Sequence, residues 1–315
     1  MSNFWEKKKV LITGGGGFLG RNIVEKIKGK GAILQIPRSK ECDLVKPDNA
    51  WKMFESGTPD IVIHAAAVCG GIGANQKHPG KFFYDNMMMG LNVIHMAHLF
   101  KVEKIITIGT VCAYPKLAAV PFRESDIWSG YPEETNAPYG IAKKSLMVMS
   151  QAYRNEYGLN SIYLIPVNMY GPGDNFHTDT SHVIPALIKK FYEAKKANLK
   201  EVVCWGTGKA TREFLYANDA AEAIVLAGEK YDKPEPMNLG NGFEISINRI
   251  AVMIADKIGY DGKIRWDTTK PDGQPRRCLD TSMAIKELGW TAKTTLDEGL
   301  DKTINWYKFC AGDEI

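Results

Sequence analysis

Four side chains in two short segments have the types and spacing needed to move protons. Tyr139 and Lys143 lie four residues apart in PYGIAKK, so on a helix they share one face. A lysine beside a phenol lowers the phenol pKa from about 10, and the pair can then exchange a proton with a carbonyl or alcohol oxygen. Thr110 and Cys112 stand two apart in TIGTVCAYPK, where an apolar run ends. An extended chain would point both of these side chains the same way.

A glycine-rich segment near the start predicts a dinucleotide site. TGGGGFLG places Gly14, Gly17 and Gly20 as GxxGxxG between a predicted strand and a predicted helix. Glycines permit a tight turn and close approach of the backbone to a pyrophosphate, and the helix N-terminus favours the phosphate charge. A flexible turn is the alternative interpretation. We expect Phe18 and Leu19, which open the helix, to line the same site.

The end of the second predicted strand bears on the choice of cofactor. Strand AILQIP continues into Arg38, Ser39 and Lys40, without the acidic residue that usually holds a ribose 2′-hydroxyl. A basic cluster suits a 2′-phosphate, so NADPH (NADP⁺) is favoured and NAD(H) is possible. Solvated surface charges are the alternative. Asp43 is expected near the adenine.

The elements that must position these residues alternate along the chain. Apolar runs that predict strands occur at 8–14, 32–37, 59–67, 102–110 and 161–171, with helical spacing between them. This alternation predicts an α/β fold, a Rossmann-type doubly wound parallel sheet with a smaller C-terminal α/β substrate domain. The expected cofactor domain spans 1–170 and returns from about 213–240. The substrate domain spans 171–212 and 241–315, with two predicted helices in its later part, at about 245–259 and 282–290.

Composition excludes several classes of protein. The 315 residues are 44% hydrophobic and 24% charged, which is ordinary for a globular protein. The net charge of +4 gives no support for binding nucleic acid, and no apolar stretch reaches membrane-spanning length or resembles a signal peptide. Six cysteines without a CxxC pair predict free thiols, a cytoplasmic protein and no metal site.

Longer motifs give a resemblance that covers nearly the whole chain. TGGGGFLG, HAAA (64–67), GTVCAYP, YGIAK, PVNMYGP (166–172), REFLYANDAA (212–221) and NLGNG together resemble the extended short-chain dehydrogenase/reductase family, which includes the NAD-dependent epimerases and dehydratases. The resemblance implies an NADP-dependent oxidoreductase/epimerase. It also implies that Ala65 and Ala66 lie at the cofactor.

A narrower set of segments is similar to one branch of that family. CGGIGAN (69–75), ETNAPYGIAK (134–143), SHVIPALIKKF (181–191), WGTGKATREF (205–214) and PDGQPR (271–276) carry this similarity. The implied reaction is 3,5-epimerisation and 4-reduction of a GDP-4-keto-6-deoxy sugar, GDP-4-keto-6-deoxymannose, to a GDP-sugar of the fucose type. A C4 ketone acidifies the hydrogens on C3 and C5, so inversion needs an acid and a base beside the ring.

The resemblance also implies roles for individual residues. Cys112 and His182 would be the acid and base, while Tyr139 and Thr110 would bind O4 and Lys143 the nicotinamide ribose. Serine is usual at the position of Thr110, whose methyl group narrows the site. For Cys112 and His182, buried packing or helix capping is the alternative.

The nucleotide end of the substrate needs a phosphate clamp and a surface for the base. Arg212 matches the family's clamp, and Trp205 matches a position near the base or ribose. Arg276, Arg277 and Lys190 are further candidates, with lysine at 190 where arginine is common, and Asn168 is expected on the sugar or diphosphate. Solvated surface positions are the alternative for each basic residue.

Two functions compete with this interpretation. One is a nucleotide-sugar 4-reductase or 4-epimerase acting on another sugar, of the deoxyheptose or colitose type. The other is a non-catalytic Rossmann regulator. Such proteins often lack the Tyr/Lys pair, whereas this chain retains Tyr139, Lys143 and Thr110, which argues against this alternative. Apolar helices at 86–100 and after YGIAK predict core packing and, from the resemblance, a homodimer through a four-helix bundle.

Overall fold

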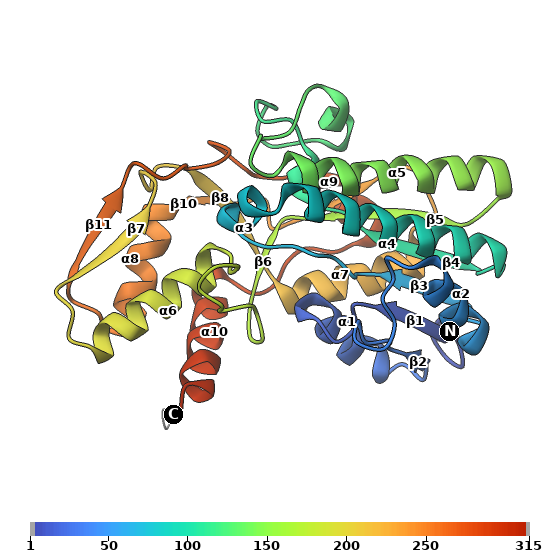
Figure 1. The fold of residues 1–315 in the computed structure, drawn as a ribbon, viewed down its shortest axis with the longest axis horizontal. Coiled ribbons are helices and arrows are strands. Elements are labelled where there is room, and N and C mark those ends of the chain that lie inside the picture. Colours follow the sequence, from blue (N-terminus) through green and yellow to red (C-terminus); the bar gives the residue numbers. More distant parts are fainter. Residues whose placement is uncertain (1–3, 313–315) are drawn as a thin grey trace.

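The protein is described by a computed structural model covering residues 4–312, which form two adjoining lobes (Figure 1). The larger lobe is built on a six-stranded sheet whose strands pair in parallel, in the order β2-β1-β3-β4-β5-β9. Its strands are β1 (Lys9–Thr13), β2 (Ile33–Gln35), β3 (Ile61–His64), β4 (Lys104–Ile108), β5 (Ser161–Pro166) and β9 (Met237–Leu239). Strands β3, β4 and β5 are buried throughout, because helices cover both faces of the sheet. The Rossmann-type fold class predicted from the sequence is confirmed.

Helices form one layer on each face of this sheet. Helices α4 and α5 pack together on one face, and α1 packs with α7 on the other (Figure 1). The helices of this lobe are α1 (Phe18–Lys28), α2 (Pro47–Gly57), α3 (Ile72–Lys77), α4 (Pro79–Leu99), α5 (Ala137–Tyr157), α7 (Ala217–Lys230) and α9 (Ser282–Leu288), with short 3₁₀ turns η1 (Val111–Ala113) and η2 (Glu124–Trp128). Local sequence sets several ends: Pro47 opens α2, and Gly158 ends α5 with φ 70°.

The smaller lobe has two short sheets and its own core. One sheet has the order β10-β8-β6 and the other pairs β11 with β7. The strands are β6 (Asn168–Tyr170), β7 (Glu201–Trp205), β8 (Thr211–Tyr216), β10 (Glu244–Ser246) and β11 (Lys263–Asp267), and the helices are α6 (Val183–Lys196), α8 (Ile247–Ile258) and α10 (Leu296–Cys310). A separate hydrophobic cluster fills this lobe, including Ile188, Phe191, Ile254 and Leu300.

Three details differ from the sequence-based expectation. The predicted strand 161–171 is two strands, β5 and β6, which belong to different sheets because the chain passes from one lobe to the other. Helix α10, which follows the two helices predicted at about 245–259 and 282–290, was not predicted. Helix α9 packs on α7 and β9, and Leu288 belongs to the core of the larger lobe. Strand β9 pairs with β5 in the larger sheet, and helix α7 packs on α1. No helix within residues 4–312 combines the length and the hydropathy that crossing a membrane requires.

Candidate active site

The glycine-rich loop forms a cradle at the carboxyl end of β1. Gly14 has φ +71°, and a Cβ there would lie 2.7 Å from the backbone of Ala66. A Cβ on Gly20 would lie 2.0 Å from the Gly14 oxygen, and Gly17 caps α1 without any side chain. Glycine at these positions therefore lets the loop pack closely on Ala66 and on the start of α1. This arrangement fits the pyrophosphate of a dinucleotide, and Ala65 and Ala66 lie against the loop.

The basic turn after β2 lies beside this cradle. The Arg38 guanidinium packs against Gly16 of the glycine loop, so closely that a Cβ on Gly16 would clash with it. Arg38, Ser39 and Lys40 are exposed, and Asp43 is exposed close by. A cation at the edge of a pyrophosphate cradle fits a ribose 2′-phosphate.

The proton-moving side chains expected from the sequence meet at the carboxyl end of β4. Thr110 lies two residues after the end of β4. Its Oγ1 accepts a hydrogen bond from the Cys112 backbone N–H at 3.2 Å. The Thr110 side chain also hydrogen-bonds the Tyr139 phenol. Gly140 lies against η1, where a Cβ would be 2.3 Å from the Cys112 carbonyl oxygen. Close packing of α5 on η1 therefore sets Tyr139 beside Thr110 and Cys112.

The protonation states in this site are set mainly by burial. Burial raises the pKa of Tyr139 well above its ordinary value, and the nearby Cys69 and Cys112 raise it further, while the Thr110 hydrogen bond lowers it. This direction is opposite to the sequence-based expectation, in which Lys143 lowers the phenol pKa. Lys143 is itself buried, which lowers its pKa to about 8. Tyr139 is therefore a neutral phenol near pH 7, the form that donates a proton.

His182 and Arg277 belong to the same region. His182 precedes α6 at its N-cap position without capping the helix through its side chain. His182 is exposed at the surface, but the protein atoms around its ring desolvate it. This desolvation, and secondarily the charge of Arg277, lower the pKa of His182. Nη1 of Arg277 lies 3.0 Å from Asn168 Oδ1 and 3.6 Å from Cys112 Sγ. Asn168, in turn, donates through Nδ2 to the Glu213 carbonyl oxygen at 2.9 Å.

The residues expected at the nucleotide end lie in different environments. Arg212 is buried and donates to the Thr211 and Asp272 carbonyl oxygens, and burial lowers its pKa to about 9. Trp205 is half exposed at the end of β7, close to where a side chain on Gly73 would project.

The other two candidates here already have protein partners. Lys190 donates to the Val203 carbonyl oxygen at 3.0 Å. Arg276 is exposed and pairs with Glu244. Their roles stay predictions.

Sequence analysis missed three residues that shape the site. Cys69 lies close enough to Tyr139 and Lys143 for its charge to affect both pKa values. Its signal was its place at the start of the CGGIGAN motif. Gln274 and Glu213 are buried residues of the PDGQPR and REF motifs that hold the Arg277 segment in place. Among residues 4–312 no group of three or more His, Cys, Asp or Glu side chains is arranged to hold a metal ion.

Comparison with known proteins identifies the family. The model of the NAD dependent epimerase/dehydratase family matches residues 10–240, most of the chain. The chain belongs to this family. The family recognised in the sequence is therefore confirmed, and it is a family of enzymes that combine oxidoreduction with epimerisation or dehydration of their substrates.

Full-length relatives narrow the comparison. GDP-L-fucose synthase 1 of Arabidopsis thaliana is 41% identical over 300 residues, 95% of this chain and 93% of that protein. Among solved structures, a GDP-6-OMe-4-keto-L-xylo-heptose reductase from C. jejuni superposes with a TM-score of 0.91 at 30% identity, over 96% of this chain and 98% of the other. A GDP-L-fucose synthetase from Naegleria fowleri bound to NADP gives 0.88 at 28% identity, over 97% and 95%.

Proposed function

We propose that this chain is an NADPH-dependent 3,5-epimerase/4-reductase that converts GDP-4-keto-6-deoxymannose to GDP-L-fucose or a close relative. The observation that carries the proposal is the placement of a thiol, Cys112, beside a hydrogen-bonded tyrosine and threonine at the end of β4. A plain reductase needs the Tyr139 and Thr110 pair, whereas inverting a ring carbon needs an additional acid and base. Similarity to GDP-L-fucose synthases along nearly the whole chain supports the same function.

The mechanism begins at the C4 carbonyl oxygen. Tyr139 and Thr110 present hydroxyl donors that stabilise negative charge on O4 when a proton leaves the neighbouring carbon. Because the Tyr139 phenol is neutral near pH 7, it can also deliver a proton to O4 during reduction. One pair of hydroxyls thus serves both the enolate and the alkoxide.

Epimerisation then depends on Cys112 and His182. One group removes the proton from C3 or C5, the electron pair moves to O4, and the other group returns a proton to the opposite face. The lowered pKa of His182 makes its protonated imidazole a stronger acid, which suits it to return the proton. Two inversions precede reduction, because only the ketone acidifies these carbons.

The remaining residues hold the two large ligands. Bound NADPH would supply hydride to C4, with its pyrophosphate at Gly14, Gly17 and Gly20 and its 2′-phosphate at Arg38. Lys143 would hold the nicotinamide ribose. At the other end, Arg212 would bind the substrate diphosphate and Trp205 would cover the base or ribose, with Asn168, Lys190 and Arg276 as further contacts. The larger lobe would therefore bind the cofactor, and the smaller lobe the GDP-sugar.

A second candidate keeps the same site and changes the sugar. The heptose reductase from C. jejuni superposes on nearly the entire chain with a TM-score of 0.91. A GDP-4-keto-heptose reductase would use Tyr139, Thr110 and Lys143 without needing Cys112 and His182. The presence of both residues favours the bifunctional enzyme.

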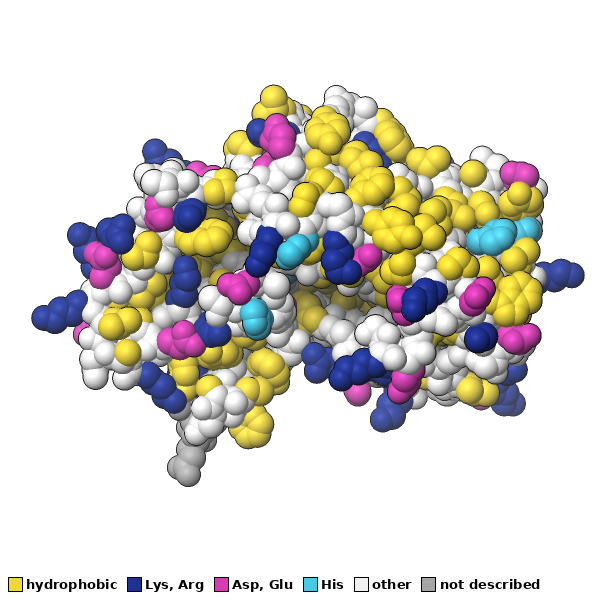
Figure 2. Space-filling model, in the orientation of Figure 1, with side chains coloured by type: hydrophobic (Ala, Val, Ile, Leu, Met, Phe, Trp, Pro, Cys, Tyr) yellow, Lys and Arg dark blue, Asp and Glu magenta, His cyan; other side chains and the backbone are white. Residues whose placement is uncertain are grey.

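The proposal includes a homodimer in the cytoplasm. Apolar side chains gather over α4 and α5 on one face of the molecule, among them Phe83, Tyr84, Val148 and Tyr157 (Figure 2). Pairing these two helices across a two-fold axis would bury this face in a four-helix bundle. The six cysteines are all free thiols, which fits a reducing compartment.

Turnover with defined substrates tests the function. Purified protein is incubated with NADPH and either GDP-4-keto-6-deoxymannose or a GDP-4-keto-heptose, and the products are identified by NMR. We expect NADPH oxidation with the 6-deoxy substrate and a product inverted at C3 and C5. Reduction of that substrate without inversion, or turnover of the heptose alone, would contradict the proposal.

A further inference from the structure

Arg277 is a buried cation that contacts the Cys112 sulfur. Its Nε donates to Gln274 Oε1 at 3.1 Å, and its Nη1 reaches Asn168 Oδ1 and the Cys112 sulfur. Within residues 4–312, no carboxylate forms an ion pair with it. A buried guanidinium without a counter-ion is costly, so this position favours an anion nearby. Among the residues that the structure describes, the ionisable group that the guanidinium contacts is the Cys112 thiol.

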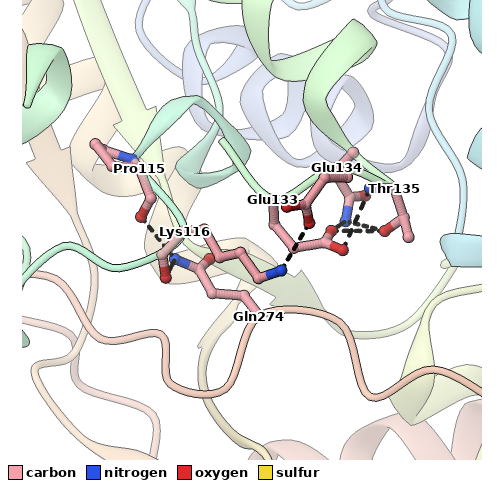
Figure 3. A network of polar contacts seen from close by, with 7 residues as sticks. Pro115, Lys116, Glu133, Glu134, Thr135 and Gln274 are labelled. Carbon is pink, nitrogen blue, oxygen red and sulfur yellow. Dashed lines mark hydrogen bonds and ion pairs between the residues drawn. The ribbon is translucent and has the colours of Figure 1, made fainter. Parts of the chain in front are cut away.

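Gln274 ties Arg277 to the loop that carries Cys112. The Gln274 amide donates to the Pro115 and Lys116 carbonyl oxygens at 3.0 and 3.2 Å (Figure 3). Its Nε2 is thereby used, which leaves Oε1 to accept from Arg277. The cation and the thiol are therefore fixed to each other through one buried side chain.

Glu213 holds the same segment from the other side. Its backbone N–H donates to the Arg277 carbonyl oxygen at 2.9 Å, and its Oε2 accepts from the Leu279 N–H at 2.7 Å. Glu213 is fully buried. Glu213 thus fixes the backbone at Arg277 and two residues after it. This backbone position places the Arg277 guanidinium beside the Cys112 thiol.

His182 responds to the same cation. The charge of Arg277 contributes to the lowered pKa of His182, after desolvation. A positive charge favours the anionic form of a neighbouring acid and the neutral form of a neighbouring base. A charge that lowers the imidazole pKa makes protonated His182 a stronger acid, and that is the form that returns a proton to the opposite face.

We propose that Arg277 is a positioning residue for epimerisation, holding the Cys112 sulfur as the anion that removes the ring proton. In that step the ring C–H bond breaks, an S–H bond forms, and the electron pair moves to O4. The inference deepens the proposed function and rests on it for the identity of the ring. It differs from the diphosphate role expected from the sequence, because Arg277 contacts the thiol itself.

Thiol reactivity in the ligand-free protein tests this role without depending on the substrate. Iodoacetamide alkylation of Cys112 is followed by mass spectrometry at pH 7.5, with the exposed Cys310 as internal reference. Arg277→Gln should slow alkylation of Cys112 at least about tenfold, because a hydrogen bond to a charged group is lost. Arg277→Lys keeps the charge and should stay within about threefold of the wild type. Arg265→Gln, which removes a surface cation paired with Glu201, is the matched control and should change nothing.

The outcomes separate the possible roles of Arg277. Slow alkylation in Arg277→Gln with rescue by lysine supports the proposal, even if the substrate proves to be another sugar. If alkylation is unchanged and only KM for the GDP-sugar rises, the proposal is overturned, and Arg277 is instead a ligand of the substrate diphosphate. Equal losses in both variants would also overturn it, because a purely structural role does not distinguish lysine from glutamine. Thermal unfolding checks the fold of each variant, and Arg277→Met replaces the glutamine variant if that one does not fold.

Discussion

Replacing Lys143 should make the ligand-free protein more stable while removing its activity. Lys143 is 2% exposed, and within residues 4–312 its Nζ has no hydrogen-bond partner in the protein. Burial lowers its pKa from 10.5 to about 8. A difference of about 2.5 between the unfolded and folded pKa values corresponds to about 3 kcal/mol. Lys143→Met removes this cost.

The pH dependence of this gain follows from the sign of the change. The folded-state pKa is below the unfolded value, so the cost is fully present below pH 8 and disappears as the pH rises towards 10.5. At pH 7 we expect the melting temperature of Lys143→Met to exceed that of the wild type by about 5 °C. At pH 10 the gap should be much smaller. Turnover should be lost at every pH, because the nicotinamide ribose loses its ligand.

The neighbouring lysine provides the matched control. Lys144 is almost as buried, but its Nζ donates to the Ile127 carbonyl oxygen and lies 4.0 Å from the centre of the Trp128 ring. Lys144→Met should therefore lower stability by about 1–3 kcal/mol. Differential scanning calorimetry of the three proteins at pH 7 and pH 10 makes the comparison. A lower melting temperature for Lys143→Met at pH 7, or a gap that is the same at both pH values, would refute the reasoning.

Three further substitutions test the cofactor site and the support of the active site. Gly20→Ala puts a Cβ 2.0 Å from the Gly14 oxygen and should weaken NADPH binding at least about 100-fold in a fluorescence titration, whereas Gly29→Ala, in open space after α1, should have no effect. Arg38→Gln should raise Kd for NADPH about tenfold and leave Kd for NADH unchanged; equal effects on both cofactors would remove Arg38 from the 2′-phosphate site. Glu213→Ala leaves three backbone N–H groups without their acceptor, one of them buried and two part-buried, and should cost about 3–5 kcal/mol in urea unfolding. A loss below about 1 kcal/mol would contradict this.

Features of the fold that depend on local sequence could be predicted. The strands β1, β3 and β4 were recognisable because residues buried on both faces form continuous apolar runs. The split between β5 and β6 was not, because the apolar run continues while the chain changes sheets. Helix α10 carries apolar residues at 296, 300 and 304, the spacing of a helix, so its signal was present but unused.

Site residues that belong to a sequence motif could be predicted. Residues that reach the site only through tertiary contacts could be predicted less well. YGIAK and TVCAYPK indicated Tyr139 and Cys112 directly. The contact between Arg277 and Cys112 joins residues 165 positions apart, and no local pattern distinguishes Arg277 from Arg276. The direction of the Tyr139 pKa was predicted wrongly, because proximity to lysine was weighed without the burial that only the folded chain reveals.

Deuterium incorporation tests the central claim most directly, that one site both epimerises and reduces. Wild type and Cys112→Ser are incubated in D₂O with NADPH and GDP-4-keto-6-deoxymannose, and the product is examined by NMR. The account predicts deuterium at C3 and C5 of the wild-type product. In Cys112→Ser it predicts exchange slowed at least about 100-fold while hydride transfer to C4 continues. A wild-type product without deuterium, or exchange at the normal rate without the thiol, would contradict it.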